Sequence, residues 1–380
     1  MTDKQTDRTE LKVSFLVTYY NQAKYVDDSM QSILAIDKPF QWEILVGDDG
    51  STDGTVEKIQ EYVASDPEHI KLFTRTADDK IGLARRQCSS MNRLNILEHS
   101  TGDYYCILDG DDWYIDTDFV KEALIILERE SSVSVVLFNY CHSITKEVKL
   151  PIDNQRLPNE GIIEGKEYLK GGLYLHCGTG VYRKCFGEDR IDFLKKYRNF
   201  NDVQIVYNAL NYGNIYFVNR IVYAHCLVSN SVWTGASNNL LFMYGVVDIA
   251  PNIFVLSGEL KNIMEEACFD RVLNAYNNID RIALLNENEK TEISKFLKPY
   301  LPTPLYDLCH YNDLTVFQRI KLNKQLFKGK VWSGFRFLTK HKLIKFLIPR
   351  LNKLPYIRDL VTENKRLRAE LEQLKSIVVK

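Results

Sequence analysis

The sequence predicts an α/β fold built on a parallel sheet. Two patterns in its N-terminal part and the composition of the whole chain support this prediction. Short apolar, β-branched runs recur along the chain, and stretches with helical spacing lie between them. Clusters of polar and acidic residues directly follow several of the runs. Of the 380 residues, 45% are hydrophobic, so the chain is long enough to bury a sizeable core.

The first predicted elements are a strand, a helix and a second strand. The runs KVSFLVT at residues 12–18 and WEILVG at residues 42–47 are short and apolar, which is typical of buried strands. Between them, apolar residues recur at spacings of three and four, which predicts a helix with one buried face: Val26, Met30, Ile33 and Leu34.

The same alternation continues after the second strand. The turn-forming run DDGSTDGT at residues 48–55 supplies N-cap residues for a helix over about residues 56–64. A third strand at 70–74, a long polar helix at 85–98 and a fourth strand at 104–108 follow. Strands that alternate with helices predict a parallel sheet, in which ligands bind beyond the carboxyl ends of the strands.

Polar clusters lie at three of these strand ends. Tyr19-Tyr20-Asn21 follows the first strand, Asp48-Asp49 the second, and Asp109-Gly110-Asp111-Asp112 the fourth. A single acidic cluster after a strand can simply form a turn. Three clusters at the same edge of a parallel sheet predict a binding site there.

The fourth-strand cluster suits a divalent cation. Mg²⁺ and Mn²⁺ prefer a few carboxylates and leave open positions for phosphate oxygens. Asp109 and Asp111 are separated by one small residue, Gly110, which leaves room for close approach. Taken alone, the cluster predicts only a cation site.

Together, the strand-end motifs resemble those of the inverting, family 2 glycosyltransferases with the GT-A fold. The resemblance covers roughly residues 12–235 and rests on VSFLVTYYN, EILVGDDGSTDGT and TGDYYCILDGDDW in this order. It implies a Rossmann-like GT-A domain at residues 12–238 that binds a nucleotide-sugar, with UDP-sugar as the expected donor. It also implies Mn²⁺ or Mg²⁺ as cofactor and a saccharide or lipid-linked saccharide acceptor in bacterial cell-surface polysaccharide synthesis.

The resemblance implies roles for the residues that would bind the nucleotide. Thr18 and Tyr20 would line the nucleotide pocket, and Asp49 would accept a hydrogen bond from the base edge. Arg85, in GLARRQ, would stabilise the nucleotide, and Asp109 would contact the ribose or a metal-bound water. The family usually has Arg-Asn where this chain has Arg-Arg-Gln, so the choice between Arg85 and its neighbour Arg86 stays open.

The resemblance also implies metal and acceptor contacts. Asp111 would bind the metal directly with Asp109 assisting, and Asp112 would support them. His225 would contact the metal or a phosphate, although a lone histidine is more often structural. His176 begins HCGT, which resembles the acceptor-side strand of the family.

Inversion at the anomeric carbon needs a carboxylate that takes the proton from the attacking hydroxyl. Asn201-Asp202 stands where the family usually has Glu-Asp, directly before the helical run VQIVYNALNYG. Asp202 is therefore the expected general base, and the alternative is that it only caps the helix. Asn201 in place of glutamate would alter how the acceptor is held.

The C-terminal third is expected to contain a helical region, at 239–325, and a basic amphipathic neck, at 326–356. The apolar stretch from Leu240 to Gly258 is interrupted by Asp248, Pro251 and Asn252, which favours a buried helix pair over a membrane span.

The basic character of the neck is pronounced, since residues 314–358 hold twelve Lys and Arg and no Asp or Glu. Mixed with large apolar residues, these charges predict docking on an anionic membrane surface. An acidic body argues against nucleic-acid binding, and a plain solvated surface stays open.

The last residues, 357–380, predict a short coiled coil. Leucines at residues 360, 367 and 374 occupy successive d positions, and Asn364 occupies one a position, which favours a parallel pair of helices and hence a homodimer. A single helix that folds back on the body is the alternative. Three heptads are marginal alone, so the rest of the chain would assist the association.

The N-terminus and the cysteines predict the cellular compartment. Residues 1–11 are polar, are expected to be disordered and lack an apolar signal region, which predicts a cytoplasmic protein, with peripheral attachment at the inner face of the cell membrane through the neck. The eight cysteines lack CxxC pairs and are expected to be reduced.

Competing functions are an inactive scaffold acting through the coiled coil and a sugar-phosphate nucleotidyltransferase. The latter would need a glycine-rich, basic loop after the first strand, where this chain has TYYNQAKY.

Overall fold

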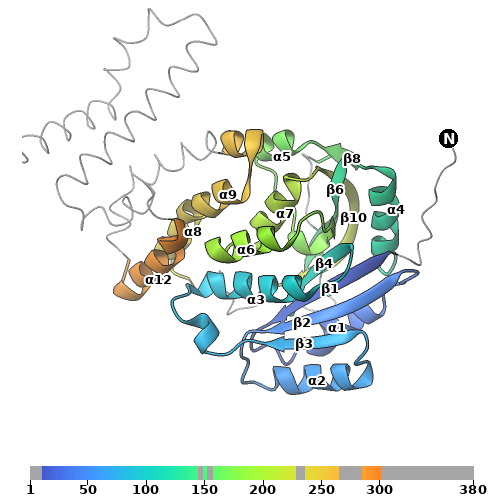
Figure 1. Cartoon of the computed structure of the whole chain (residues 1–380), viewed down its shortest axis with the longest axis horizontal. Coiled ribbons are helices and arrows are strands. Elements are labelled where there is room, and N and C mark those ends of the chain that lie inside the picture. The colour runs from blue at the N-terminus through green and yellow to red at the C-terminus, as the bar shows by residue number, and fades with distance from the viewer. Residues whose placement is uncertain (1–10, 144–148, 152–156, 228–235, 265–284, 301–380) are drawn as a thin grey trace, which may run out of the picture. The chain divides into compact units, whose positions relative to one another are not determined.

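The computed structural model describes residues 11–143, 149–151, 157–227, 236–264 and 285–300 (Figure 1). The predicted neck, the coiled coil and the predicted disorder of the first ten residues lie outside the described residues. The chain divides into two compact units, one of residues 1–237 with 251–264 and the other of residues 238–250 with 265–380. The predicted domain boundaries stay predictions.

The described part contains strands, α-helices and short 3₁₀ helices (η) in alternation. In chain order they are β1 Lys12–Tyr19, α1 Val26–Leu34, β2 Gln41–Asp48, α2 Thr55–Ser65, β3 Ile70–Thr74, η2 Asp78–Lys80, α3 Arg85–His99, β4 Tyr104–Asp109, β5 Trp113–Tyr114, α4 Phe119–Arg129, β6 Val133–Ser143, β7 Lys149–Pro151, β8 Glu160–Ile163, α5 Gly165–Gly171, η3 Cys177–Thr179, β9 Gly180–Arg183, α6 Glu188–Tyr197, α7 Asp202–Leu210, β10 Asn214–Cys226, α8 Asn238–Val247, α9 Ile249–Val255, α12 Glu287–Leu297 and η4 Lys298–Tyr300.

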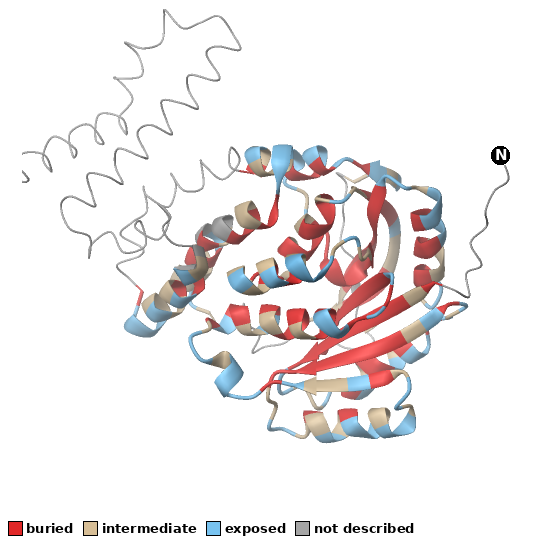
Figure 2. Ribbon diagram, viewed as in Figure 1, coloured by how far each residue is buried: buried red, intermediate tan, exposed pale blue. Residues whose placement is uncertain are grey.

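The first four strands form the predicted parallel sheet. Their order is β3-β2-β1-β4, and each neighbouring pair is parallel. Nearly every residue of β1 and β2 is buried, as expected for strands covered on both faces (Figure 2). The four predicted strands lie within one residue of their observed ends, and the third matches its predicted bounds.

Beyond β4 the sheet is mixed, which corrects the prediction of a parallel sheet. The order continues β4-β9-β6-β10-β5, with β9 antiparallel to both neighbours and β10 parallel to β6. β6 follows β4 through helix α4 and runs in the same direction, whereas β9 lies between these two strands and runs opposite to both. β5 and β8 pair with β10, and β7 with β6.

Helix α3 lies against the parallel half of the sheet and brings residues to the strand ends. It contacts β1 and β2, and α6 packs beside it (Figure 1). The contact with β2 is close, because a Cβ atom on Gly47 would lie 2.7 Å from Asn92 Oδ1. The Asn92 amide donates to the Gly47 carbonyl at 2.8 Å, which ties the helix to the strand.

The apolar stretch at residues 240–258 forms helices α8 and α9, so the predicted helix pair is confirmed. Within the described residues, no helix combines the length and apolar character needed to cross a membrane. The six cysteines in the described part carry free thiols, as predicted for them.

Candidate active site

The carboxyl ends of β1, β2 and β4 bring the predicted polar clusters to one edge of the sheet. In the strand pairing, Thr18 lies opposite Asp109 and Tyr19 lies opposite Asp48. The hydroxyl of Thr18 donates to Asp109 Oδ1 at 3.4 Å. The prediction that residues after the first, second and fourth strands meet at one edge is therefore confirmed.

The two aspartates after β2 have different surroundings. Asp48 forms the turn, since its carboxylate accepts from the backbone N–H groups of Gly50 and Ser51 at 2.9 Å. Asp49 is buried and forms an ion pair with Arg75, whose Nη1 lies 2.7 Å from its Oδ1. Burial raises the pKa of Asp49 although Arg75 opposes the shift. Only Asp49 therefore keeps a carboxylate that the turn does not use.

Two basic residues lie beside Asp49. The ammonium of Lys80 donates to the Asp49 carbonyl oxygen at 2.5 Å and lies 4.8 Å from the centre of the Tyr20 ring. Tyr20 itself is 52% exposed, so its ring offers a surface for a ligand. Arg75 was not among the predicted site residues, because nothing in the sequence distinguishes it from a surface arginine.

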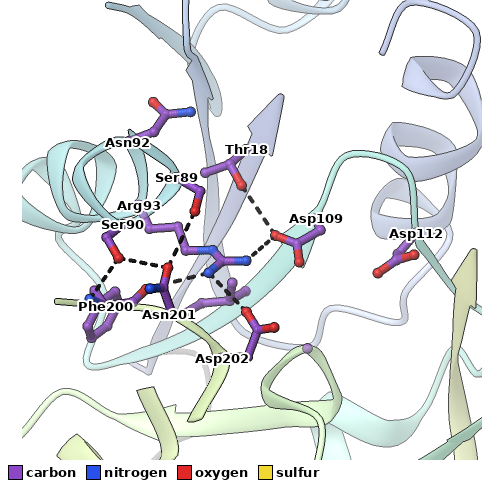
Figure 3. A network of polar contacts seen from close by, with 12 residues as sticks. Thr18, Ser89, Ser90, Asn92, Arg93, Asp109, Asp112, Phe200, Asn201 and Asp202 are labelled. Carbon is purple, nitrogen blue, oxygen red and sulfur yellow. Dashed lines mark hydrogen bonds and ion pairs between the residues drawn. The ribbon is translucent and has the colours of Figure 1, made fainter. Parts of the chain in front are cut away.

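Arg93 links the strand ends to the second half of the domain (Figure 3). Its Nη2 lies 2.6 Å from Asp109 Oδ1, and its Nη1 lies 3.0 Å from Asp202 Oδ1. The side chain is only 5% exposed. Burial disfavours its charge, but the two carboxylates outweigh burial, and the pKa of Arg93 is raised. One guanidinium thus contacts both Asp109 and Asp202, which lie far apart in the sequence.

Arg93, which contacts both Asp109 and Asp202, was not among the predicted site residues, and the expected role of Arg85 at the nucleotide stays a prediction. Arg85 is the first residue of α3 and is exposed, whereas Arg86 is buried. Arg93 lies about two turns further along the same helix. Residues three and four apart lie on the same face of a helix, so Arg93 shares a face of α3 with Ser90 and Leu97, which are buried. This spacing is the sequence feature that could have identified Arg93 as an inward-facing residue.

Asp202 is the first residue of α7, and Asn201 is its N-cap. Asn201 makes no capping bond with its side chain; its Oδ1 accepts instead from the Ser90 hydroxyl at 2.8 Å, which joins α7 to α3 (Figure 3). The side chain of Asp202 is 34% exposed. Burial raises the pKa of Asp202, but Arg93 and then His176 lower it more, and the net shift is downward.

The loop after β4 contains the remaining carboxylates. Asp112 is buried, and its oxygens accept from the Tyr223 hydroxyl at 2.5 Å and from the Cys226 N–H at 2.7 Å. Burial and the charges of Asp111 and Asp109 raise the pKa of Asp112. Tyr19 fills the space beside Gly110, since a Cβ there would lie 2.1 Å from the Tyr19 ring. Gly110 is thus required by packing against Tyr19.

Asp111 has the properties expected of a cation ligand. Burial, and then the negative charge of Asp109, raise its pKa to about 6. Arg93 pairs with Asp109 and partly offsets the negative charge, so the main cost at Asp111 is the burial of its own charge, which a divalent cation would reduce. The carboxylate oxygens of Asp109 and Asp111 are the kind of ligand that Mn²⁺ and Mg²⁺ prefer.

Two histidines lie near the loop after β4: His225 is on β10, and His176 is the N-cap of η3. Among the described residues, Asp112, His176 and His225 form a group whose candidate ligand atoms lie within 4.8 Å of one another. His176 Nδ1 accepts from the Gly178 N–H at 3.1 Å. Burial, with the other imidazoles nearby, lowers the pKa of His225 to about 4, so its ring is neutral near pH 7. Since the Asp112 oxygens already accept hydrogen bonds, His225 is the better candidate ligand.

Comparison with known proteins finds a family whose model resembles part of this chain. Residues 14–187 match the model of the family described as glycosyl transferase family 2. The putative glycosyltransferase EpsE of Bacillus subtilis is 31% identical over 33% of this chain and 41% of its own length. The putative teichuronic acid biosynthesis glycosyltransferase TuaG of Bacillus subtilis is 30% identical over 32% of this chain and 44% of its own length. The chain thus spans less than half of these relatives.

A solved structure shares the fold. The crystal structure of S. aureus TarS 1-349 in complex with UDP superposes with a TM-score of 0.51 and 16% identity, covering 79% of this chain and 86% of that one. At this identity the likeness shows the fold alone. It confirms the predicted α/β, GT-A-like architecture for the described part of the chain.

Proposed function

We propose that this chain moves a sugar from a nucleoside diphosphate donor to a saccharide with inversion of the anomeric carbon. The proposal starts from the match of residues 14–187 to the glycosyl transferase family 2 model. The observation that carries the proposal is the position of Arg93 between Asp109 and Asp202. A carboxylate beside the cation and a carboxylate for the acceptor proton lie on either side of one guanidinium. Transfer between a donor and an acceptor requires both groups close together.

The donor is expected to be a UDP-sugar. Thr18 and Tyr20 would line the pocket, Asp49 would accept from the base edge, and Arg85 would contact the nucleotide. The exposed ring of Tyr20 supports its role, and the Asp49 carboxylate is not used by the turn, although it is ion-paired with Arg75. Binding of UDP by TarS, which shares the fold, favours a uridine nucleotide.

The cation would be held by Asp111 with Asp109 assisting and with His225 as a further contact. When bound, Mn²⁺ or Mg²⁺ neutralises the charge that builds on the leaving diphosphate. The raised pKa of Asp111, about 6, supports a cation there, because burial first and then the charge of Asp109 disfavour the ionised carboxylate, and a cation would offset both.

Asp202 would act as the general base. The acceptor hydroxyl oxygen attacks the anomeric carbon, the bond from that carbon to the diphosphate oxygen breaks, and the hydroxyl proton moves to Asp202. The pairing with Arg93 keeps Asp202 ionised, as a proton acceptor must be, although the lowered pKa also makes it a weaker base. Asn201 and His176 would hold the acceptor, and Asp112 would keep the loop after β4 in place through Tyr223.

The acceptor is expected to be a saccharide or lipid-linked saccharide of the bacterial cell surface. The name of TuaG, a relative over part of the chain, supports this setting. The expected place of action is the cytoplasmic face of the cell membrane, where such acceptors are extended. Neither an inactive scaffold nor a nucleotidyltransferase is favoured, because the matched family consists of glycosyltransferases.

A donor screen tests the function. The purified chain is incubated with UDP- and other nucleotide-sugars and Mn²⁺, and release of the nucleoside diphosphate is measured with and without candidate saccharides. Asp202→Asn should lower acceptor-dependent turnover at least about 100-fold, because the general base is lost. Nucleotide affinity should stay the same in this variant. Unchanged turnover by Asp202→Asn would exclude Asp202 as the base.

A further inference from the structure

A second histidine lies directly beside His225. His142, in β6, and His225, in β10, are partners in the parallel pairing of these strands. Their Nδ1 atoms are 3.2 Å apart, within hydrogen-bond distance, and their ring centres are 5.3 Å apart. His142 has no role in the function proposed above.

The short contact restricts the protonation of both rings. In two neutral imidazoles with facing Nδ1 atoms, one Nδ1 carries a proton and donates, and the other accepts. If His225 donates, its Nε2 keeps a free lone pair. If His142 donates, Nε2 of His225 carries the proton and is unable to bind a cation.

The aromatic surroundings hold the two rings in this relation. Tyr140 lies two residues before His142 on β6, and its ring centre is 5.5 Å from that of His142 and 6.4 Å from that of His225. The interplanar angles are 88° and 72°, so both imidazoles meet Tyr140 edge to face. His176 also packs on His225, at 5.1 Å between ring centres. Rotation of His225 away from His142 would disturb these contacts.

We propose that His142 is a positioning residue that accepts the Nδ1 proton of His225 and thereby presents the Nε2 lone pair of His225 to the cation. The inference rests on the proposed function, in which His225 contacts the metal. Histidines that bind metals generally donate their other ring N–H to a fixed acceptor, and His142 Nδ1 is the described atom that can serve here.

Two substitutions of His142 separate the acceptor atom from the ring. Asn Oδ1 occupies nearly the same place along the side chain as His Nδ1 and accepts hydrogen bonds, so His142→Asn keeps the acceptor. His142→Leu removes it and keeps the bulk. His225→Ala removes the ligand, and His99→Asn, at the exposed end of α3, is a matched control.

Mn²⁺ binding to the full-length chain in the presence of UDP, followed by electron paramagnetic resonance, tests the inference. His142→Leu should bind Mn²⁺ about 10- to 100-fold more weakly, while His142→Asn and His99→Asn stay near wild type. The Mn²⁺ concentration for half-maximal turnover should rise in His142→Leu with little change in kcat. Pulsed measurements should show one coordinated imidazole nitrogen in the wild type, which His225→Ala removes.

The outcomes distinguish the inference from the function on which it rests. Wild-type Mn²⁺ affinity in His142→Leu, together with a loss in His225→Ala, would overturn the inference alone. Two coordinated imidazoles in the wild-type spectrum, one of which is lost in His142→Leu, would make His142 a ligand and overturn its positioning role. If wild-type protein bound no Mn²⁺ with UDP, or if His225→Ala had no effect, the proposed metal contact would fall and the inference with it.

Discussion

Asp111 carries a charge that the fold disfavours in the absence of a cation. Its pKa is raised from 3.8 to about 6, so the ionised carboxylate costs folding free energy in full above that pH, and the cost falls away as the pH drops from about 6 toward 3.8. Asp111→Asn should therefore stabilise the cation-free protein at pH 7.5 by on the order of 1 kcal/mol, with little gain at pH 4. Urea unfolding at the two pH values measures this.

The same carboxylate links cation binding to pH. Since protonated Asp111 is a poor ligand, Mn²⁺ affinity of the wild type should fall as the pH drops below about 6. The rise in Tm on adding Mn²⁺ with UDP should disappear in Asp111→Asn. An equal rise in Tm in this variant would show that Asp111 does not bind the cation.

Arg93 forms ion pairs with two carboxylates, and replacing it should lower both the stability and the activity of the protein. Arg93→Met leaves Asp109 and Asp202 without their shared partner, which should cost about 1–3 kcal/mol, since both carboxylates are partly exposed. Chemical denaturation measures the loss. Combining Arg93→Met with Asp202→Asn should recover part of it, because one unpaired charge is removed. A purely additive double variant would contradict this coupling.

At the scale of the element, the end of β4 depends on the absence of a side chain at Gly110. A Cβ atom there would lie 2.1 Å from the Tyr19 ring, and Tyr19 is fully packed, with its hydroxyl 2.5 Å from Ser29 Oγ. Gly110→Ala should therefore destabilise the protein by about 1–3 kcal/mol and displace Asp109 and Asp111, which weakens cation binding.

Gly187→Ala is the control for this prediction. Gly187 precedes α6, and a Cβ there would meet only Asp189 Oδ1 at an ordinary 3.4 Å. Its φ of −99° suits any residue. Calorimetry should show a clearly lower Tm for Gly110→Ala and a smaller loss for Gly187→Ala, because Gly187 is the N-cap of α6, where alanine is less favourable than glycine. An equal Tm in both variants would mean that Tyr19 moves aside without cost.

The elements also differ in how far the sequence predicts them. β1 to β4 were predicted closely because each is a continuous apolar run between turns. β10 is longer but irregular: its register with β6 shifts between Val218 and Ile221 and again before Tyr223, and the exposed Asn219 interrupts the apolar pattern. Such a strand is recognised only from its partner, and it brings His225 beside His142.

For the whole molecule, the coiled coil at residues 357–380 stays a prediction from the heptads. A chain that ends at residue 356 should be monomeric by light scattering at micromolar concentration, while the full chain should be a dimer. Replacing the d-position Leu367 by lysine should act like the truncation, because a charge in the seam opposes pairing. A monomeric full-length chain would reject the homodimer.

The basic neck at residues 326–356 is predicted to bind anionic membranes. The full chain should float with vesicles that contain anionic lipid and remain unbound to neutral vesicles, and the binding should weaken as salt increases. Replacing Lys340, Lys342 and Lys345 by glutamine should reduce flotation, since each basic residue contributes about 1 kcal/mol. Equal binding to neutral and anionic vesicles would contradict this role.

The sequence by itself determined the parallel half of the sheet and the strand-end carboxylates, because apolar runs and the turns after them are local patterns. The meeting of Thr18 with Asp109 followed from this, since parallel strands end at one edge. The tertiary structure decided the antiparallel placement of β9, the choice of Arg93 beside the two carboxylates and the pairing of His142 with His225. These contacts join residues far apart in the chain, so their partners are set by packing and burial, which no local pattern records.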